Sequence, residues 1–198
     1  MKGARWGILV LVVGLLGWWL WPEPELRHPP GVLVAEEPEQ RPMSEARRWE
    51  KDGYAVTALA QFKIRALVLH RERYSHGRES DLSPLDLALG WGALSDQSVI
   101  DQIDISQGGR WYRWRSKKLP VPNGVIITKS ANVHLIPASE EVAETLLSAI
   151  RGSIVDLQGY LVEVKGEGGW KWVSSLRRDD TGGGSCELFW VEKAKVSE

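Results

Sequence analysis

WGILVLVVGLLGWWLW, residues 6–21, is the stretch that decides how the whole chain is organised. It is an unbroken apolar run without a charged residue. A helix over these residues is about 24 Å long at 1.5 Å per residue, a little short of the roughly 30 Å hydrocarbon core of a bilayer. Lys2 and Arg5 before the run and the tryptophans at its end suit the two membrane interfaces. We therefore predict a cytoplasmic start and a single transmembrane signal-anchor helix over residues 1–21.

The charges around this run indicate its orientation. Positive charge precedes the run, and the first charges after it are Glu23 and Glu25, so the amino terminus should stay in the cytoplasm. We expect a single-pass protein of a bacterial inner membrane, with its carboxy-terminal domain in the periplasm or outside the cell. One alternative is a buried core helix of a soluble protein. The other is a cleaved secretory signal, which also has a basic start and a short apolar core. Such a signal needs small residues at its exit, whereas this run ends in tryptophan before Pro22.

The rest of the chain is long enough for one ordinary domain. Its length is about 175 residues. The formal net charge of the protein is −1 at pH 7, so no overall field favours nucleic acid. The single cysteine, Cys186, excludes an internal disulfide, which is compatible with a periplasmic domain that is stabilised by its core alone.

The region after the anchor divides into a spacer and a globular domain. Residues 22–42 contain six of the ten prolines, and proline resists helix formation and favours extended chain. We predict a semi-rigid spacer there, with the apolar residues 31–35 as the part that could pack on the domain as an edge strand. The globular domain is expected over residues 43–198.

The pattern of residues 43–198 predicts a mainly β domain. Residues 54–74 read as a long strand or two, because Phe62 and Ile64 alternate with charged residues. We place Ile64 and Leu157 in the core. Helices are predicted over 45–52, 83–89, 95–102 and 139–152. Further strands are predicted over 103–106, 111–115, 125–128, 154–164, 170–176 and 186–196, with a hairpin turn at Asn123-Gly124.

Strands in series with a few short helices indicate an α+β domain whose sheet curls into a small barrel. The segments GSIVDLQGYLVEV (152–164), WKWVSSL (170–176) and CELFWVEKAKV (186–196) resemble part of an oligonucleotide/oligosaccharide-binding (OB) barrel. Gly159 falls where a strand of such a barrel bends sharply. The resemblance covers about the last 60 residues and implies an architecture without fixing a function.

The candidate binding surface is WYRWRSKK, residues 111–118, where aromatic and basic residues interleave on one short strand. On a strand, Trp111, Arg113 and Arg115 share one face, and Tyr112 and Trp114 share the other. A solvent-facing strip of this kind can stack on bases or sugars and pair with phosphates. The alternative is that the tryptophans fill a small core and the arginines are solvated. The candidate ligand-binding residues are Trp111, Arg113, Trp114, Arg115, Lys117 and Lys118.

The candidates for chemistry are few. Cys186, His134 and an acid such as Asp179 or Asp180 would supply the parts of a cysteine nucleophile. A single cysteine at the start of a strand is more often a small buried apolar residue, and we expect His134 to hydrogen-bond a loop. We therefore assign no catalytic residue.

The candidates for a metal site are also weak. His70 and His76 have acidic residues nearby but no second ligand at a recognised metal-site spacing. We predict no metal site and no cofactor.

These observations favour a non-enzymatic, membrane-tethered binding or assembly module of the bacterial envelope. The expected partner is another envelope protein or an anionic glycan or lipid. One alternative is an envelope enzyme that uses Cys186 and His134, or a His/Asp site. The other is binding of single-stranded nucleic acid or another anionic polymer through residues 111–118. Nucleic acid is the less expected ligand, because outside the membrane it would be met only in DNA uptake or transfer.

Overall fold

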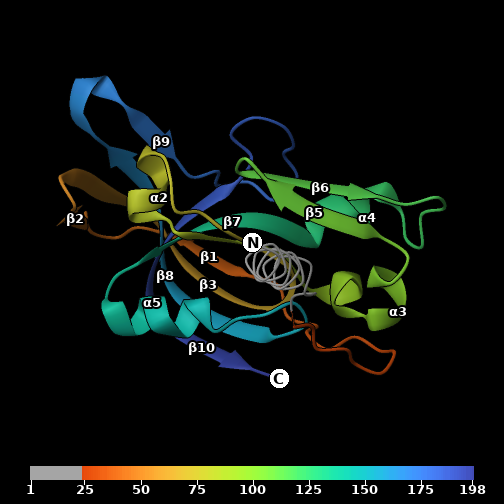
Figure 1. The fold of residues 1–198 in the computed structure, drawn as a ribbon. Coiled ribbons are helices and arrows are strands. Elements are labelled where there is room, and N and C mark those ends of the chain that lie inside the picture. Colours follow the sequence, from red (N-terminus) through yellow and green to blue (C-terminus); the bar gives the residue numbers. More distant parts are fainter. Residues whose placement is uncertain (1–23) are drawn as a thin grey trace, which may run out of the picture.

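The computed structural model describes residues 24–198, and the predicted anchor over residues 1–21 lies outside them (Figure 1). Within the described residues, no helix combines the length and the apolar character needed to cross a membrane. The strands are β1 (Glu39–Pro42), β2 (Arg48–Lys51), β3 (Tyr54–Arg73), β4 (Leu85–Gly90), β5 (Asp104–Gly108), β6 (Trp111–Arg115), β7 (Ser130–Pro137), β8 (Ile154–Lys165), β9 (Lys171–Val173) and β10 (Glu187–Ser197). The helices are α2 (Arg78–Leu82), η1 (Gly92–Ser95), α3 (Gln97–Ile100), α4 (Asn123–Thr128), α5 (Glu140–Leu147) and η2 (Glu167–Gly169).

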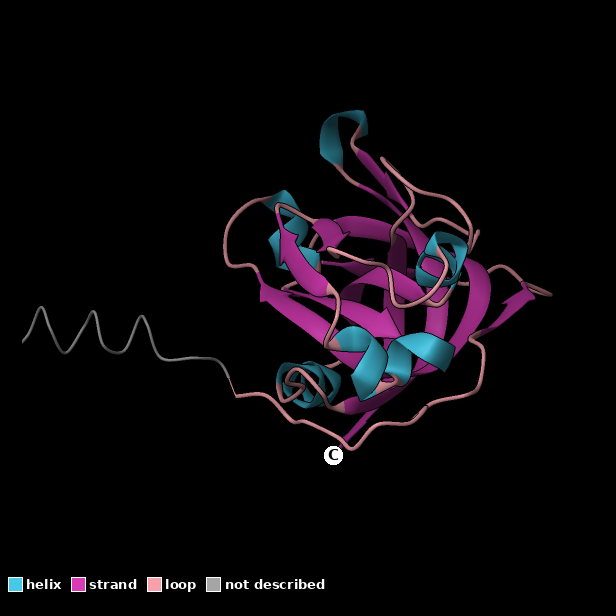
Figure 2. Cartoon of the chain, turned by 90° about the vertical axis from the view of Figure 1, so that its right-hand side faces the viewer, coloured by secondary structure: helices cyan, strands magenta, loops and turns pink. Residues whose placement is uncertain are grey.

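Five strands form a nearly closed ring. They pair in the order β3, β4, β7, β10 and β8, and β8 pairs again with β3. Only the pairing of β7 with β10 is parallel among these contacts. The short helices lie around the strands rather than inside them (Figure 2). The prediction of a mainly β domain with a few short helices is confirmed.

The long strand β3 makes the ring possible, because it belongs to both of its sides. Its first part, Ala55 to Leu67, pairs with β8, and its last part, Leu67 to Arg73, pairs with β4. The register of β3 shifts once against each partner, which is how a strand bends without losing its ladder. Of the one or two strands predicted over residues 54–74, the structure forms one.

Two apolar clusters lie on opposite faces of the sheet. The larger cluster contains residues from all five ring strands, such as Ile64, Leu87, Leu135, Leu157 and Phe189, and fills the ring. The smaller cluster contains the alternate residues of the same strands, among them Ile136, Leu188 and Trp190, and is packed against Trp49, Trp170 and Trp172. The sheet is therefore covered on part of its outer face as well.

Residues 24–38 form a strap that runs against the domain. The Leu26 N–H donates to the Arg151 carbonyl at 2.9 Å, and the Gly92 N–H donates to the Val34 carbonyl at 2.7 Å. The Val34 side chain is fully buried in the larger cluster. Beyond the strap, β1 pairs with β3. The described part of the proline-rich segment thus packs on the domain, but residues 31–35 do not form the edge strand that we considered: Val32 makes only an isolated bridge with Asp96, and the strand of this segment is β1.

The predicted helix over residues 45–52 is wrong, because β2 occupies half of this segment. Asp52 and Gly53 have φ values of 52° and 80°, as a two-residue hairpin turn requires, and they fold β2 back onto β3. Trp49 then stacks on Trp190 with ring centroids 4.9 Å apart. The Asp-Gly pair was the local signal for this hairpin.

Two further predictions are wrong. Residues 85–90 form strand β4 rather than the end of a helix, since they pair with β3 on one side and β7 on the other and every one of them is buried. Residues 123–128 form helix α4 rather than a hairpin turn and a strand. The helix follows Pro122, whose carbonyl accepts from the Val125 N–H at 2.9 Å.

The remaining elements lie close to their predicted positions. Helix α5 begins after Ser139, whose side chain accepts a hydrogen bond from the Val142 N–H, as an N-cap does. Helix α3, the hairpin of β5 and β6, and strands β8, β9 and β10 also fall in the predicted segments.

Gly159 allows β8 and β10 to approach closely. A Cβ atom at Gly159 would lie 2.0 Å from the Trp190 carbonyl oxygen, which belongs to the backbone and cannot move aside. We expect Gly159→Ala to lower the free energy of unfolding by about 1–3 kcal/mol, as overpacking does. Urea titration measures the change. Gly124→Ala is the control, because its Cβ would meet nothing within 4 Å, and equal stabilities of the two variants would contradict the prediction.

Candidate functional site

The basic strip, which we define as Trp111 and the basic residues Arg113, Arg115, Lys117 and Lys118, lies on the exposed face of β6 and in the loop after it. Along β6, exposure alternates as the strand pattern predicted, and Trp111 is 46% exposed. On the other face, Tyr112 and Trp114 pack against the larger apolar cluster. Trp114 therefore does not share the exposed face with the other candidate ligand-binding residues.

Part of the strip borders the start of the strap. A pocket of about 920 Å³ is lined by Arg115, Lys117 and Lys118 on one side and by Glu25, Arg27 and Arg151 on another. Arg115 lies 3.4 Å from Asp104, and Arg27 lies 2.7 Å from Asp101. Within residues 24–198, Lys117 and Lys118 have no ion-pair partner. The strip therefore carries uncompensated positive charge beside the first described residues.

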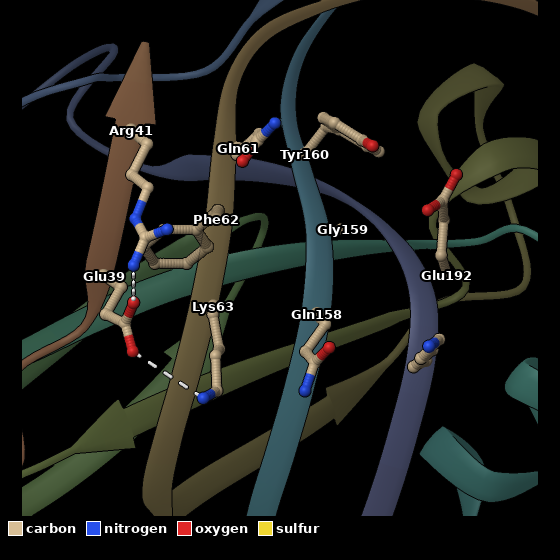
Figure 3. A pocket seen from close by; sticks show the side chains of 10 residues that line it. Glu39, Arg41, Gln61, Phe62, Lys63, Gln158, Gly159, Tyr160 and Glu192 are labelled. Atoms are coloured by element: carbon tan, nitrogen blue, oxygen red, sulfur yellow. Dashed lines mark hydrogen bonds and ion pairs between the residues drawn. The ribbon is translucent and has the colours of Figure 1, made fainter. Parts of the chain in front are cut away.

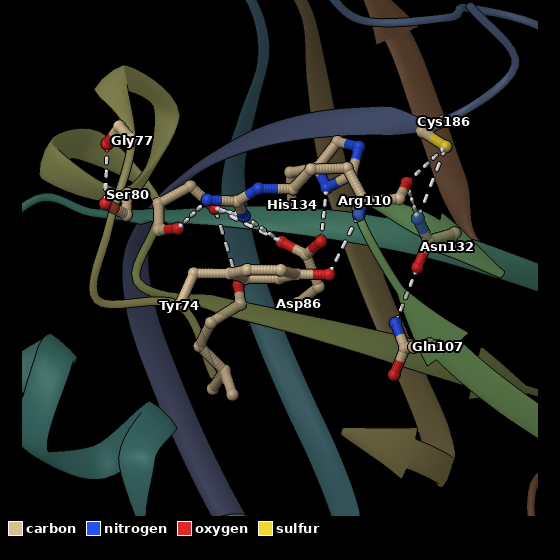
Figure 4. A network of polar contacts seen from close by, with 11 residues as sticks. Tyr74, Gly77, Ser80, Asp86, Gln107, Arg110, Asn132, His134 and Cys186 are labelled. Carbon is tan, nitrogen blue, oxygen red and sulfur yellow. Dashed lines mark hydrogen bonds and ion pairs between the residues drawn. The ribbon is translucent and has the colours of Figure 1, made fainter. Parts of the chain in front are cut away.

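A polar network lies on the outer face of the ring. On β7, Asn132 and His134 point to the face opposite that of Val133 and Leu135, because successive side chains alternate along a strand. His134 is aligned with Asp86 on β4, and Cys186 directly precedes β10. Figure 4 shows these side chains together with Arg110. His134 lies in strand β7, and its side chain faces Asp86 of β4 and Cys186 of the loop before β10.

Arg110 fixes one side of this network. It lies in the two-residue turn between β5 and β6 with a φ of 68°, which is unusual for a residue other than glycine. Its guanidinium lies 2.6 Å from the Asp86 carboxylate and 3.8 Å from the centre of the Tyr74 ring. The Asp86 side chain is 1% exposed, so its negative charge depends on such partners.

His134 is the second partner of Asp86. Its Nδ1 atom lies 2.9 Å from Asp86 Oδ2, in an ion-pair contact that is not aligned as a hydrogen bond. The His134 side chain is 4% exposed and packs against Trp172, with ring centroids 4.9 Å apart. Burial alone would lower the pKa of His134, but the Asp86 carboxylate and the Cys186 sulfur raise it to about 9. His134 is therefore an imidazolium at neutral pH.

Cys186 connects the network to a pocket. The Asn132 side-chain amide donates to its sulfur at 3.3 Å and to the Arg110 carbonyl at 3.1 Å. The half-buried Cys186 lines a pocket of about 200 Å³, together with Trp111, Trp114 and residues of the loop 180–185. The sulfur is thus in contact with buried polar groups and with a space that a small molecule can enter.

The other sequence candidates lie elsewhere or have different partners. Asp179 pairs with Arg177, and Asp180 accepts a hydrogen bond from Ser175 Oγ at 2.6 Å, so neither is the acid beside His134. Asp180 does line the pocket at Cys186.

The two other histidines considered as metal ligands contact neutral side chains. His70 Nδ1 lies 3.2 Å from Gln107, and His76 Nδ1 lies 2.9 Å from Ser75. Residues 24–198 contain no group of three or more histidine, cysteine, aspartate or glutamate side chains placed to hold a metal ion.

Sequence reasoning missed three members of the network. Asp86 was included in the helix predicted over residues 83–89, and Arg110 and Asn132 were assigned to no element. The available signal was the alternation of Asn132 and His134 with Val133 and Leu135, which indicates a strand with one polar face.

A third pocket, of about 440 Å³, lies over β1, β3, β8 and β10 (Figure 3). Three of its charged side chains contact each other: Glu39 lies 2.8 Å from Arg41 and 3.6 Å from Lys63. Glu39 and Glu192 give this pocket mixed charge, whereas the charged residues of the basic strip are all positive.

Comparisons with models of protein families, with curated proteins and with solved structures find no match to this chain. The functional argument therefore depends on the geometry of these sites.

Proposed function

We propose that this protein is a membrane-tethered binding module of the bacterial envelope, with its domain outside the cytoplasm, and that the basic strip binds anionic lipid headgroups or an anionic glycan. The observation that carries the proposal is the position of the strip beside the beginning of the strap. Binding or assembly, rather than catalysis, is the role that we assign to this surface.

The tether supports this choice of ligand. From Trp21, the last residue of the apolar run, to Glu25 the chain extends at most about 14 Å. Glu25 lines the same pocket as Lys117 and Lys118. If residues 6–21 span the bilayer, the strip is held near its surface. There, each lysine or arginine gains about 1 kcal/mol from an anionic membrane.

We also propose that the ring is an OB-like barrel. Support comes from the strand order of the ring, the parallel pairing of β7 with β10, and the position of α5 between β7 and β8. Ligands of OB barrels bind on the face of the second and third strands, between the loops after the first and fourth. In chain order, the second and third strands of the ring are β4 and β7, which carry Asp86 and His134.

Hydrogen exchange of the full-length chain in bilayers tests the proposal. We expect the amides of residues 116–119 and 121 to exchange at least about tenfold more slowly in bilayers containing phosphatidylglycerol than in phosphatidylcholine. High salt should remove the difference, because it screens exposed charges. Slowing in both lipids, at any salt concentration, would mean that the strip does not recognise anionic headgroups.

Charge-reversed variants provide the matched comparison. The combined change Arg113→Glu, Lys117→Glu and Lys118→Glu should abolish the protection. The control is Lys193→Glu with Lys195→Glu, which changes exposed lysines on β10 instead. Loss of protection in the control as well would show that overall charge, and not the strip, is responsible. A protein partner is indicated if protection requires a membrane extract and survives the charge reversal.

A further inference from the structure

We propose that Cys186 is a nucleophile that accepts an acyl group from a small carboxylic ester or thioester, with His134 as its acid–base partner and Asp86 as the residue that orients His134. The inference goes beyond the proposed function, because it requires neither the membrane nor an anionic ligand. It assigns an activity to the polar network and to the pocket of about 200 Å³ at Cys186.

The network contains a nucleophile, a base and a group that positions the base. Asp86 Oδ2 lies 2.9 Å from His134 Nδ1, and His134 lies between Asp86 and Cys186 (Figure 4). These residues come from three strands or strand ends that are neighbours in the ring, β4, β7 and β10. The ring therefore fixes their relative positions.

The charges of the network suit a thiolate. Arg110 and His134 both contact the buried Asp86 carboxylate, so one negative charge faces two positive ones. The proposed nucleophile is the thiolate, whose negative charge would face the second positive charge of the network.

The Asn132 amide supplies a donor for the reaction. One of its N–H bonds is directed to the Arg110 carbonyl and the other to the Cys186 sulfur, 3.3 Å away. When the sulfur is acylated, the second N–H becomes free to donate to the carbonyl oxygen, which carries negative charge in the tetrahedral intermediate. Asn132 is buried, so this donor is held in place before the substrate enters.

The reaction consumes only the ester or thioester and one water molecule. The Cys186 thiolate attacks the carbonyl carbon, the bond to the leaving oxygen or sulfur breaks, and His134 gives that atom its proton. Water then attacks the thioester, neutral His134 takes a proton from it, and Cys186 leaves as the thiolate. The products are a carboxylic acid and an alcohol or thiol.

The pocket limits the size and character of the acyl group. Trp111, Tyr112 and Trp114 supply apolar contact, and the loop 180–185 supplies polar groups. A volume of about 200 Å³ accepts a short acyl chain. Trp111 belongs both to this pocket and to the basic strip, so the pocket opens beside the proposed binding surface.

p-Nitrophenyl acetate is the probe. The full-length chain in detergent micelles should release one equivalent of p-nitrophenolate in a burst at pH 6.5, and peptide mass spectrometry after an acid quench should locate the acetyl group on Cys186. The burst should be at least about tenfold faster than acetylation of a short peptide that contains residues 184–188. Cys186→Ala should abolish it. An acetyl group on another residue, or a rate equal to that of the peptide, would overturn the proposal.

The role of His134 is tested by its own variant and a matched control. His134→Gln should slow the burst at least about tenfold. His76→Gln, which changes an exposed histidine, should leave it unchanged. Circular dichroism establishes that each variant is folded. If the His134→Gln variant folds and keeps the rate of the unchanged protein, His134 is excluded as the partner of Cys186. If the variant does not fold, the acetylation rate of Cys186 relative to the peptide decides whether the network activates Cys186. None of these results depends on binding by the basic strip.

Discussion

Leu157→Asp is expected to leave the domain unfolded at room temperature. Leu157 is fully buried on β8 and lies opposite Ile64 of β3, which is 1% exposed. The new carboxylate would lie among apolar side chains of the ring without a partner, at a cost of several kcal/mol. Such a cost is comparable with the whole stability of an ordinary domain, about 5–15 kcal/mol. The measurement is the near-ultraviolet circular dichroism of the full-length chain, which should lose its tertiary signal. Ile64→Asp should do the same.

The neighbouring residue provides the control for this variant. Gln158 follows Leu157 on β8 and is exposed, so Gln158→Asp introduces the same side chain on the opposite face. This variant should unfold cooperatively at nearly the temperature of the unchanged protein. If Leu157→Asp and Gln158→Asp unfold alike, β8 does not present Leu157 to the interior of the ring.

The stability of the domain is expected to fall as the pH rises from about 6.5 to 9. The pKa of His134 is raised from its ordinary value of 6.5 to about 9, because the Asp86 carboxylate and the Cys186 sulfur outweigh the effect of burial. The folded state therefore holds a proton that the unfolded chain has released. The stabilisation is fully present below about pH 6.5 and is lost as the pH rises through 9. Over this range it amounts to about 3 kcal/mol.

Urea titrations at several pH values measure this contribution. The free energy of unfolding of the full-length chain should decrease by about 1.4 kcal/mol per pH unit between these limits, in addition to the background from other groups. His134→Gln should show the background alone, and His76→Gln should behave like the unchanged protein. The same pH dependence in the His134→Gln variant would mean that another group binds the proton.

The sequence was informative where one face of an element is buried and the other is exposed. Strand β3 alternates in this way through Phe62 and Ile64, and α5 carries an N-cap at Ser139, so both were predicted correctly. Strand β4 is buried on both faces, and the alternation that would identify it is absent. Asn123-Gly124 has the composition of a hairpin turn, but residues 123–128 form helix α4. A preference for turn and strand has an effect only where a second strand pairs with the segment.

The residues of the candidate site were predicted only in part. Cys186 and His134 were recognised by residue type, and the structure places them together. The acidic residue that contacts His134 was not recognised, because Asp86 lies on the strand that was assigned to a helix. Pairing of β4 with β7 brings Asp86 opposite His134, and such a contact between distant residues cannot be read from spacing along the chain.

The strap also determines how the domain would respond to mechanical force. The Leu26 N–H bonds the Arg151 carbonyl, the Val34 N–H bonds Ser95 Oγ, and the Val34 side chain is enclosed by the core. A force applied to the chain at Pro24 would therefore break these contacts one after another. The ring strands would carry the force only after the strap had detached. The strap thus protects the folded ring from forces applied at the amino-terminal end of the domain.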